Sequence, residues 1–85
     1  MRFVAVLVSH EDRYELGSDT LTRQPYLGIP VSNRMAGYVE FYRLTEEEFA
    51  RFRADRDTAK RFSAECRGRR HDGRLVLPPG PDRGV

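Results

Sequence analysis

The chain has 85 residues, 39% of them hydrophobic and 33% charged, with a formal net charge of +2. It is too short for two domains of ordinary size, and no apolar run approaches the roughly 20 residues that a membrane-spanning helix needs. The single cysteine, Cys66, excludes an intrachain disulfide and a four-cysteine zinc site. We therefore expect one small cytoplasmic domain that does not contact a membrane.

Residues 3–8 predict the first strand. In an extended chain, successive side chains point to opposite faces, which here carry Phe3, Ala5 and Leu7 on one side and Val4, Val6 and Val8 on the other. A strand that is apolar on both sides is typical of the middle of a sheet, or of a sheet covered on both faces. The pattern predicts such a central or doubly covered position.

The next two segments give weaker signals. Residues 10–24 are polar, although Tyr14 and Leu16 would alternate inward from a short strand. Residues 25–31 include two prolines, which cannot donate a hydrogen bond to a β-ladder. We expect residues 25–31 to form at best an edge strand or an extended loop.

Residues 38–44 predict a strand that leads into a helix. They are rich in strand-forming residues, and the sequence that follows, from Thr45 to Glu48, matches a capping box. In that motif the Thr45 hydroxyl accepts from the backbone N–H of Glu48, and the Glu48 side chain accepts from the N–H of Thr45. Leu44 and Phe49 occupy the two positions of a hydrophobic staple. A helix is therefore predicted to begin after Thr45.

The helical region extends over about residues 45–67 as one long helix or two short ones. An apolar stripe at helical spacing is formed by Phe49, Phe52, Ala59, Phe62 and Cys66. Arg56 interrupts this stripe, so Asp55 or Asp57 could cap a second helix. Gly68 suits a left-handed cap at the end of the region, and residues 74–77 predict a last short strand.

The order of these elements predicts an α+β fold. Strands early in the chain and helices late in it favour a mostly antiparallel sheet packed on one helical layer. We assign residues 1–77 to this single domain and residues 78–85, which are rich in Pro and Gly, to a C-terminal tail.

Charge is distributed unevenly along the chain. Residues 1–50 hold five arginines against eight acids, whereas residues 51–74 hold nine bases against four acids. Fourteen of the fifteen bases are arginine, either through codon usage in a GC-rich genome or because arginine binds carboxylates and phosphates bidentately. Such polarity concerns partners and association rates rather than the fold.

The sequence His10-Glu11-Asp12, just after the first strand, is the strongest candidate for chemistry. Histidine beside carboxylates can support acid–base catalysis or bind a metal, but this spacing matches no zinc motif, and a solvated turn is the alternative. The chain has no glycine-rich phosphate loop and no nucleophile elbow. We expect no catalytic residues, no cofactor and no metal, and we keep a small enzyme or accessory subunit using His10 as an alternative.

Two groups of residues suggest binding. Tyr38 and Tyr42 share one strand face, which would anchor a protein contact if it were half exposed and would be ordinary core if it were not. The basic cluster just past the helix would contact phosphates, or would only complement the helix dipole, and consists of Arg67, Arg69, Arg70 and Arg74 with His71.

These observations favour a non-enzymatic protein-binding protein. The binding residues we expect are Tyr38, Tyr42, Arg67, Arg69 and Arg70, and the more specific hypothesis is a bacterial toxin-neutralising protein of the immunity or antitoxin type. Nucleic-acid binding through Arg67, Arg69, Arg70 and Arg74 is an alternative function. A core this small also suggests a homodimer as an alternative to a monomer.

Overall fold

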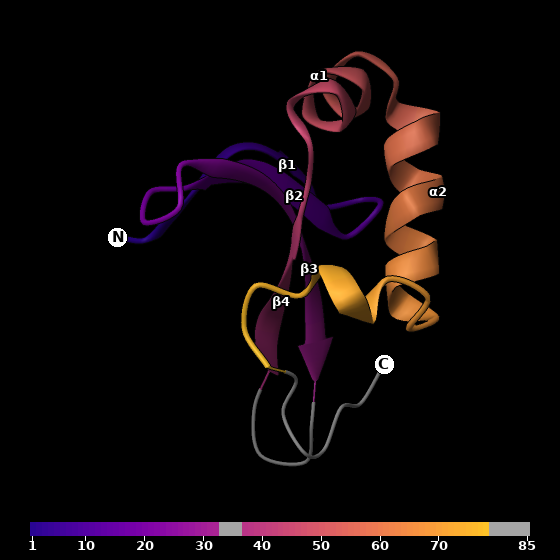
Figure 1. Ribbon diagram of the computed structural model, residues 1–85. Coiled ribbons are helices and arrows are strands. Elements are labelled where there is room, and N and C mark those ends of the chain that lie inside the picture. Colours follow the sequence, from indigo (N-terminus) through magenta and orange to yellow (C-terminus); the bar gives the residue numbers. More distant parts are fainter. Residues whose placement is uncertain (33–36, 79–85) are drawn as a thin grey trace.

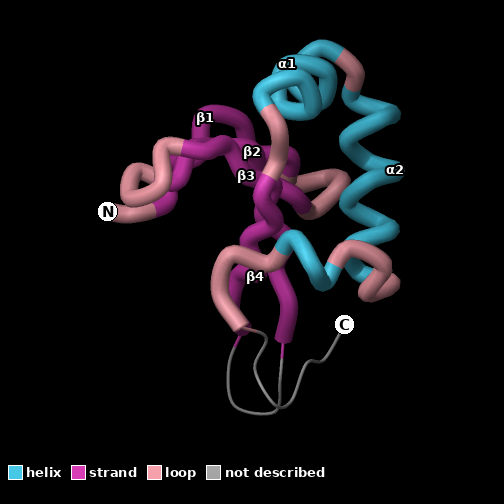
Figure 2. The backbone as a smooth tube through the Cα atoms, viewed as in Figure 1, coloured by secondary structure: helices cyan, strands magenta, loops and turns pink. Residues whose placement is uncertain are grey.

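The computed structural model describes residues 1–32 and 37–78 (Figure 1). Its elements in chain order are β1 (Phe3–Ser9), β2 (Tyr14–Asp19), β3 (Gln24–Ser32), β4 (Gly37–Arg43), α1 (Glu46–Ala54), α2 (Arg56–Arg67) and the short 3-10 helix η1 (Asp72–Arg74). The strands pair antiparallel, each with its neighbour in sequence, in the order β1-β2-β3-β4. Figure 2 shows both α-helices on one side of the strongly bent sheet. The predicted α+β fold is confirmed.

Strand β1 lies at an edge of the sheet, so the prediction of a central or doubly covered strand is wrong. Only Leu7 of this strand packs against the buried core, whereas Val4, Val6 and Val8 are 43%, 55% and 52% exposed. The chain turns directly from β1 into β2, so among the described elements β1 pairs with β2 alone. Both helices contact β3 instead.

Strand β3 lies between β2 and β4, so the prediction of an edge strand or loop for residues 25–31 is also wrong. Pro25 and Pro30 cost the sheet few hydrogen bonds, because each lies where the ladder that its N–H would join ends. Leu44 donates to the Pro25 carbonyl at the last rung beside β4, and Pro30 lies beyond Gly28, the last residue of β3 that pairs with β2. Each missing N–H therefore falls at the end of a ladder, where proline is tolerated.

The core lies between the sheet and the helices. Tyr14 and Leu16 face inward as predicted, and so do Tyr42 and Leu44 at the end of β4. The buried cluster is completed from β3 and the two helices by Leu27, Ile29, Val31, Phe52, Ala59, Phe62 and Cys66. The face of β4 that carries Tyr42 is thus the covered face, and the ordinary core alternative holds for Tyr42.

The helical region is two helices. Helix α1 begins after Thr45 with both bonds of the predicted capping box, at 3.1 and 2.9 Å. Asp55 ends α1 and caps α2, since its carboxylate accepts from the N–H groups of Asp57 and Thr58 and from the Thr58 hydroxyl. A side chain that caps the second helix fixes the break at this residue.

The segment after α2 departs from the sequence expectations in two ways. Gly68 ends α2 with φ of −78°, and the residue with left-handed φ is Arg69, at 62°. Instead of a strand over residues 74–77, the chain forms η1 and a single bridge from Leu75 to Tyr42.

Of the predicted tail, residues 79–85 lie outside the described residues. No helix in the described ranges is long and apolar enough to cross a membrane.

The other face of the sheet holds a second, smaller aromatic cluster. Phe3 and Phe41 stack with ring centroids 3.7 Å apart, and Tyr26 meets both rings edge-on. The Tyr26 ring lies over Gly17, where a Cβ would come within 2.8 Å of the ring and 2.2 Å of the Val4 carbonyl. The missing side chain at Gly17 therefore lets β1, β2 and this ring approach one another.

Candidate protein-binding surface

The two edges of the sheet differ in how they are covered. At β4, the Val76 N–H donates to the Phe41 carbonyl at 2.9 Å, and Leu75 bridges to Tyr42. No described segment covers the outer side of β1. We call this side, with the backbone of Phe3–Ser9 and the exposed valines Val4, Val6 and Val8, the β1 edge.

The backbone of the β1 edge offers hydrogen-bonding groups to the outside. Thr20 donates to the Arg2 carbonyl at 2.8 Å, so this carbonyl points toward β2. Because the direction alternates along a strand, the N–H and C=O groups of Phe3 and Ala5 point outward. The register then shifts between Ala5 and Leu7, which is a bulge at Val6.

An ion pair anchors the beginning of β1. The Arg2 guanidinium donates to both carboxylate oxygens of Asp19, at 2.9 and 3.0 Å, and Asp19 also accepts from the Leu21 N–H and the Thr22 hydroxyl. These bonds hold the pKa of the nearly inaccessible Asp19 carboxyl well below its usual range, and the bond from Arg2 is the largest cause. Asp19 thereby fixes the start of β1 to the turn between β2 and β3.

The far end of β1 is fixed to α2 by the turn at residues 10–13. Arg56 donates to Asp12 at 2.8 Å and to Glu11 at 2.7 Å, and Arg67 donates to the backbone carbonyls of Asp12 and Arg13. The bond from Arg56 is the main cause of the lowered pKa of Asp12. With both ends held, the β1 edge is a pre-organised surface, which lowers the entropy cost of binding.

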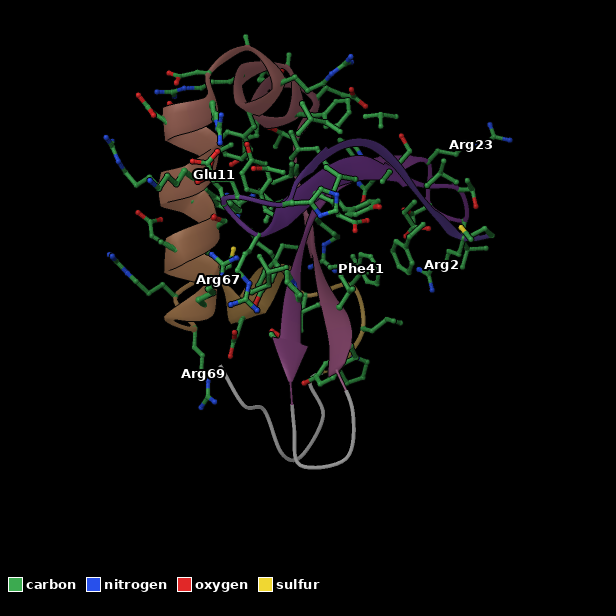
Figure 3. All side chains as sticks on the ribbon, turned by 180° about the vertical axis from the view of Figure 1, so that it is seen from behind. Arg2, Glu11, Arg23, Phe41, Arg67 and Arg69 are labelled. Atoms are coloured by element: carbon green, nitrogen blue, oxygen red, sulfur yellow. The ribbon has the colours of Figure 1, made fainter. Side chains whose placement is uncertain are left out.

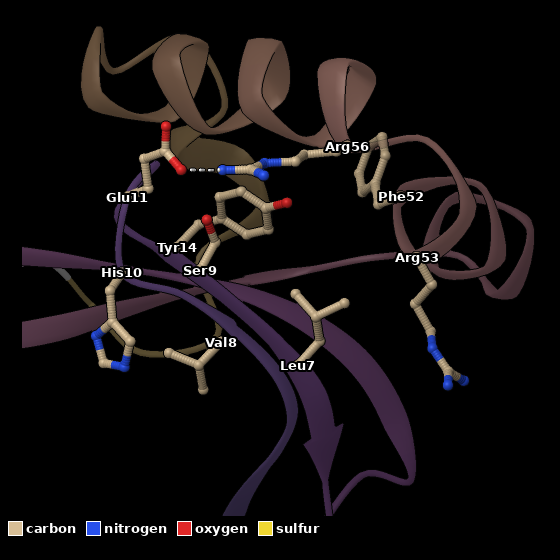
Figure 4. A pocket seen from close by; sticks show the side chains of 9 residues that line it. All are labelled: Leu7, Val8, Ser9, His10, Glu11, Tyr14, Phe52, Arg53 and Arg56. Atoms are coloured by element: carbon tan, nitrogen blue, oxygen red, sulfur yellow. Dashed lines mark hydrogen bonds and ion pairs between the residues drawn. The ribbon is translucent and has the colours of Figure 1, made fainter.

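A groove of about 370 Å³ lies beside the end of β1, on the helical side of the sheet (Figure 4). It is lined by Leu7, Val8, Ser9, His10, Glu11, Tyr14, Phe52, Arg53 and Arg56. Its lining combines apolar side chains with the ion pair of Arg56 and Glu11 and with Arg53. Arg53 stacks over Phe49 and has no carboxylate partner among the described residues.

The structure does not assemble His10, Glu11 and Asp12 into an acid–base site. In Figure 4 the His10 imidazole points away from the Glu11–Arg56 pair. Both carboxylates are occupied by Arg56, and Asp12 also lies 3.9 Å from Lys60. The motif therefore acts as a turn that joins the sheet to α2. The described ranges hold no group of three His, Cys, Asp or Glu side chains that could bind a metal.

The predicted binding residues are placed differently from one another. Tyr42 is completely buried, with its hydroxyl 3.0 Å from Glu40, and Tyr38 is half-buried against the core. Arg67 is turned toward the sheet, whereas Arg69 projects from the end of α2 (Figure 3). Arg70 is also exposed. Of the five predicted residues, Arg69 and Arg70 are the two that lie on exposed surface.

The basic cluster after α2 does not form one patch of available cations. Arg74 makes two bonds to the Glu48 carboxylate, at 2.7 and 2.9 Å, and lies over the Phe62 ring. His71 pairs with Glu65 at 2.8 Å, and Arg67 is bound to backbone carbonyls. Two of the four arginines of this cluster, Arg67 and Arg74, are therefore engaged within the molecule.

The sequence reasoning missed the three valines of β1 as surface residues. The signal that could have found them is the short polar turn after β1, which makes β2 its neighbour, together with the late position of the helices. Comparison with protein-family models, with curated proteins and with solved structures finds no match. The surface is therefore interpreted from its own geometry and chemistry.

Proposed function

We propose that this protein is a small non-enzymatic binding protein whose partner is another protein. The observation that carries the proposal is the β1 edge, a rigidly held apolar strand with outward backbone groups and three exposed valines. Folded proteins normally protect such an edge with charges, proline, a bulge or a covering segment, because it is a template for pairing with another chain. β1 has the bulge at Val6, but Phe3–Ser9 contains neither a charge nor a proline. An edge left apolar is suited to receive a partner strand.

The binding mode that fits this edge is strand addition. The partner contributes an extended segment whose backbone bonds to the outward groups of Phe3 and Ala5, and its side chains alternate between the two faces of the sheet. Side chains on the helical face reach the groove beside Leu7, where Arg53 offers a charge to an acidic group. Arg69 and Arg70 lie on exposed surface near the end of α2 and serve as peripheral contacts.

Within this class, the specific hypothesis is a bacterial toxin-neutralising protein of the immunity or antitoxin type that acts in the cytoplasm. A partner of this kind is blocked by occupancy of its surface, so the neutralising chain needs no catalytic residues of its own. Expression of the gene product encoded next to this one, with and without this protein, tests the hypothesis. Growth arrest that this protein does not relieve would contradict it.

The binding proposal is tested by substituting the β1 edge. We expect the tagged protein, purified from its native cells, to carry one protein in near-stoichiometric amount. Val6→Lys should remove that protein, because a lysine on an edge strand opposes pairing. Leu21→Lys, which makes the same change at a 72% exposed residue outside β1, is the matched control and should retain it. Equal retention by both variants would exclude the β1 edge as the binding surface.

The two alternative functions receive less support. A nucleic-acid interface would need a joint patch of cations, yet Arg67 and Arg74 are engaged inside the molecule. An enzyme using His10 would need a base or acid that converges on it, and Glu11 and Asp12 are held by Arg56 instead. His10→Ala tests the enzyme alternative, which predicts that this change abolishes an activity without unfolding the protein.

A further inference from the structure

We infer that a second copy of this chain occupies the β1 edge when no other protein is bound, so that two sheets join through antiparallel β1 strands. This inference rests on the proposed use of β1 as a docking edge. It assigns a symmetric dimer in which β1 of each copy pairs with β1 of the other, and it makes self-association and partner binding mutually exclusive.

The bulge in β1 makes the strand complementary to itself. Residues that pair directly across a ladder share a face, so the register with β2 places Val4 and Leu7 on the helical face and Phe3, Ala5 and Val8 on the open face. In a two-fold arrangement centred between Ala5 and Val6, Val4 meets Leu7 of the second copy, and Phe3 meets its Val8. Each of these pairs joins residues from the same face.

A register centred on Val6 does not have this property. It would set Val4 opposite Val8 of the second copy, and these residues lie on different faces of the sheet. A shift of one residue exchanges the faces and is therefore excluded. A shift of two residues would keep the faces but replace the pairing of Val4 with Leu7 by that of Val4 with Ser9, so the apolar pairs favour the register centred between Ala5 and Val6. The register is thus a consequence of the irregularity between Ala5 and Leu7.

The backbone of β1 agrees with this arrangement. The N–H and C=O groups of Phe3 and Ala5 point away from β2, as derived from the bond between Thr20 and Arg2. These are the groups that a new neighbour would bond. Beside them, apolar cross-strand pairs such as Val4 with Leu7 add stabilisation that an exposed strand lacks.

The charges at the two ends of β1 are paired within each copy, since Arg2 bonds to Asp19 and Glu11 bonds to Arg56. They do not oppose the arrangement. Its specificity comes from the strand pairing, in which each contact occurs twice because of the two-fold symmetry.

The expected dimer is concentration-dependent rather than permanent. A single strand pair with a few apolar contacts is a small interface, of the kind found in weak and transient association. A protein partner with further contacts outside β1 would therefore displace the second copy. Self-pairing covers the valines until that partner arrives.

Sedimentation equilibrium over a range of concentrations tests the inference directly. We expect the mass of the wild-type chain to rise from the monomer value of 9.9 kDa toward twice that value as the concentration increases. Val6→Lys should stay monomeric at every concentration, since the two lysines would lie close together on either side of the symmetry axis. Leu21→Lys should associate like the wild type. A wild-type chain that remains monomeric, or a Leu21→Lys variant that dissociates as much as Val6→Lys, would overturn the inference.

Cross-linking tests the register. A mixture of the Ala5→Cys and Val6→Cys variants should form the mixed disulfide faster than a mixture of Ala5→Cys and Leu21→Cys, while the buried native Cys66 stays unreacted. Equal rates in the two mixtures would exclude the register centred between Ala5 and Val6. If Val6→Lys loses its protein partner although the wild type is monomeric, the inference fails and the proposed function stands.

Discussion

Strands β3 and β1 show opposite relations between composition and burial. β3 contains two prolines and a glycine, yet Tyr26, Leu27 and Ile29 have no exposed surface. Residues 3–8 of β1 form an unbroken apolar run, yet Val4, Val6 and Val8 are each about half exposed. The difference teaches that the burial of a strand depends on which segments become its neighbours. β3 has a strand on each side and helices above it, whereas β1 has one neighbouring strand within residues 1–32 and 37–78.

The contrast between β3 and β1 also indicates which residues affect folding stability and which affect binding. Apolar groups of β3 lose their contact with water on folding, which is the main stabilising contribution in a small domain. The valines of β1 remain in contact with water in the folded chain. Changes in β3 should therefore affect folding, and changes at Val6 should affect association.

Thiol reactivity offers the largest measurable difference between the covered side and the edge. Cys66 has no exposed surface, and burial raises the pKa of its thiol to about 12. A cysteine introduced by Val6→Cys lies at an exposed position of the β1 edge. With an aromatic disulfide reagent, we expect the introduced thiol to react about a thousandfold faster than Cys66, which must wait for unfolding.

The pH dependence of this reaction follows from the same pKa. The rate at the introduced thiol should rise up to about pH 8.5, the ordinary pKa of cysteine, whereas folded Cys66 forms little thiolate there. Because the pKa of Cys66 is raised in the folded state, its contribution to stability is complete below about pH 8.5 and declines as the pH rises toward 12. Equal reactivity of the two thiols in the folded protein would place Cys66 outside the core.

Truncation of β3 should destabilise the fold more than truncation of β1. Ile29→Ala removes a completely buried side chain from the core and should lower the free energy of unfolding by about 2–5 kcal/mol. Val6→Ala changes an exposed side chain and should stay within about 0.5 kcal/mol of the wild type. Urea denaturation at low protein concentration measures both; similar losses would mean that β1 is buried in solution.

Gly17→Ala tests the contact that holds β1 against β2. A Cβ at this position would lie 2.2 Å from the Val4 carbonyl and 2.8 Å from the Ala5 Cα, both parts of the backbone. We expect a loss of about 1–3 kcal/mol, the usual range for overpacking. Gly73→Ala, where a Cβ meets nothing within 4 Å, is the control and should change stability little. In Gly17→Ala, loss of the contact with the Tyr26 ring would be visible in the near-ultraviolet circular dichroism.

Local signals in the sequence predicted the start of α1 and the inward face of β2, both on the covered side of the molecule. The capping box at Thr45 and the cap at Asp55, one of the two caps considered for a second helix, depend on bonds within three residues, and both are formed. The inward direction of Tyr14 and Leu16 follows from the two-residue alternation of side chains along a strand. Such features follow from neighbouring residues, so a single sequence contains the information.

Long-range pairing decided what the sequence left open or predicted incorrectly. The place of β3 depends on where its ladders with β2 and β4 end, relative to Pro25 and Pro30. The expected partner-facing arginines Arg67 and Arg74 meet carbonyl and carboxylate groups far away in sequence. The β1 edge could not be predicted either, since its exposure reflects the absence of a second neighbouring strand in the described fold.

Acid should affect the start of β1 more than β3, and by a smaller amount than the substitutions above. The pKa of Asp19 is lowered in the folded state, chiefly by the bond from Arg2, so its contribution is present above the unfolded pKa of about 4 and is lost as the pH falls toward the folded pKa. Asp19→Asn lacks this contribution at every pH. The stability difference between the wild type and Asp19→Asn should therefore be largest near neutral pH and should shrink below about pH 4.

Urea midpoints of both proteins across this pH range measure the difference, and hydrogen exchange locates it. In acid we expect the amides of β1 that bond to β2 to lose protection before those of β3, because Asp19 joins Arg2 to the turn between β2 and β3. A pH-independent difference would mean that the Asp19 carboxylate is not the group that responds to acid. Simultaneous loss of protection in β1 and β3 would mean that the edge and the covered sheet unfold as one unit, even though only β3 lies under the helices.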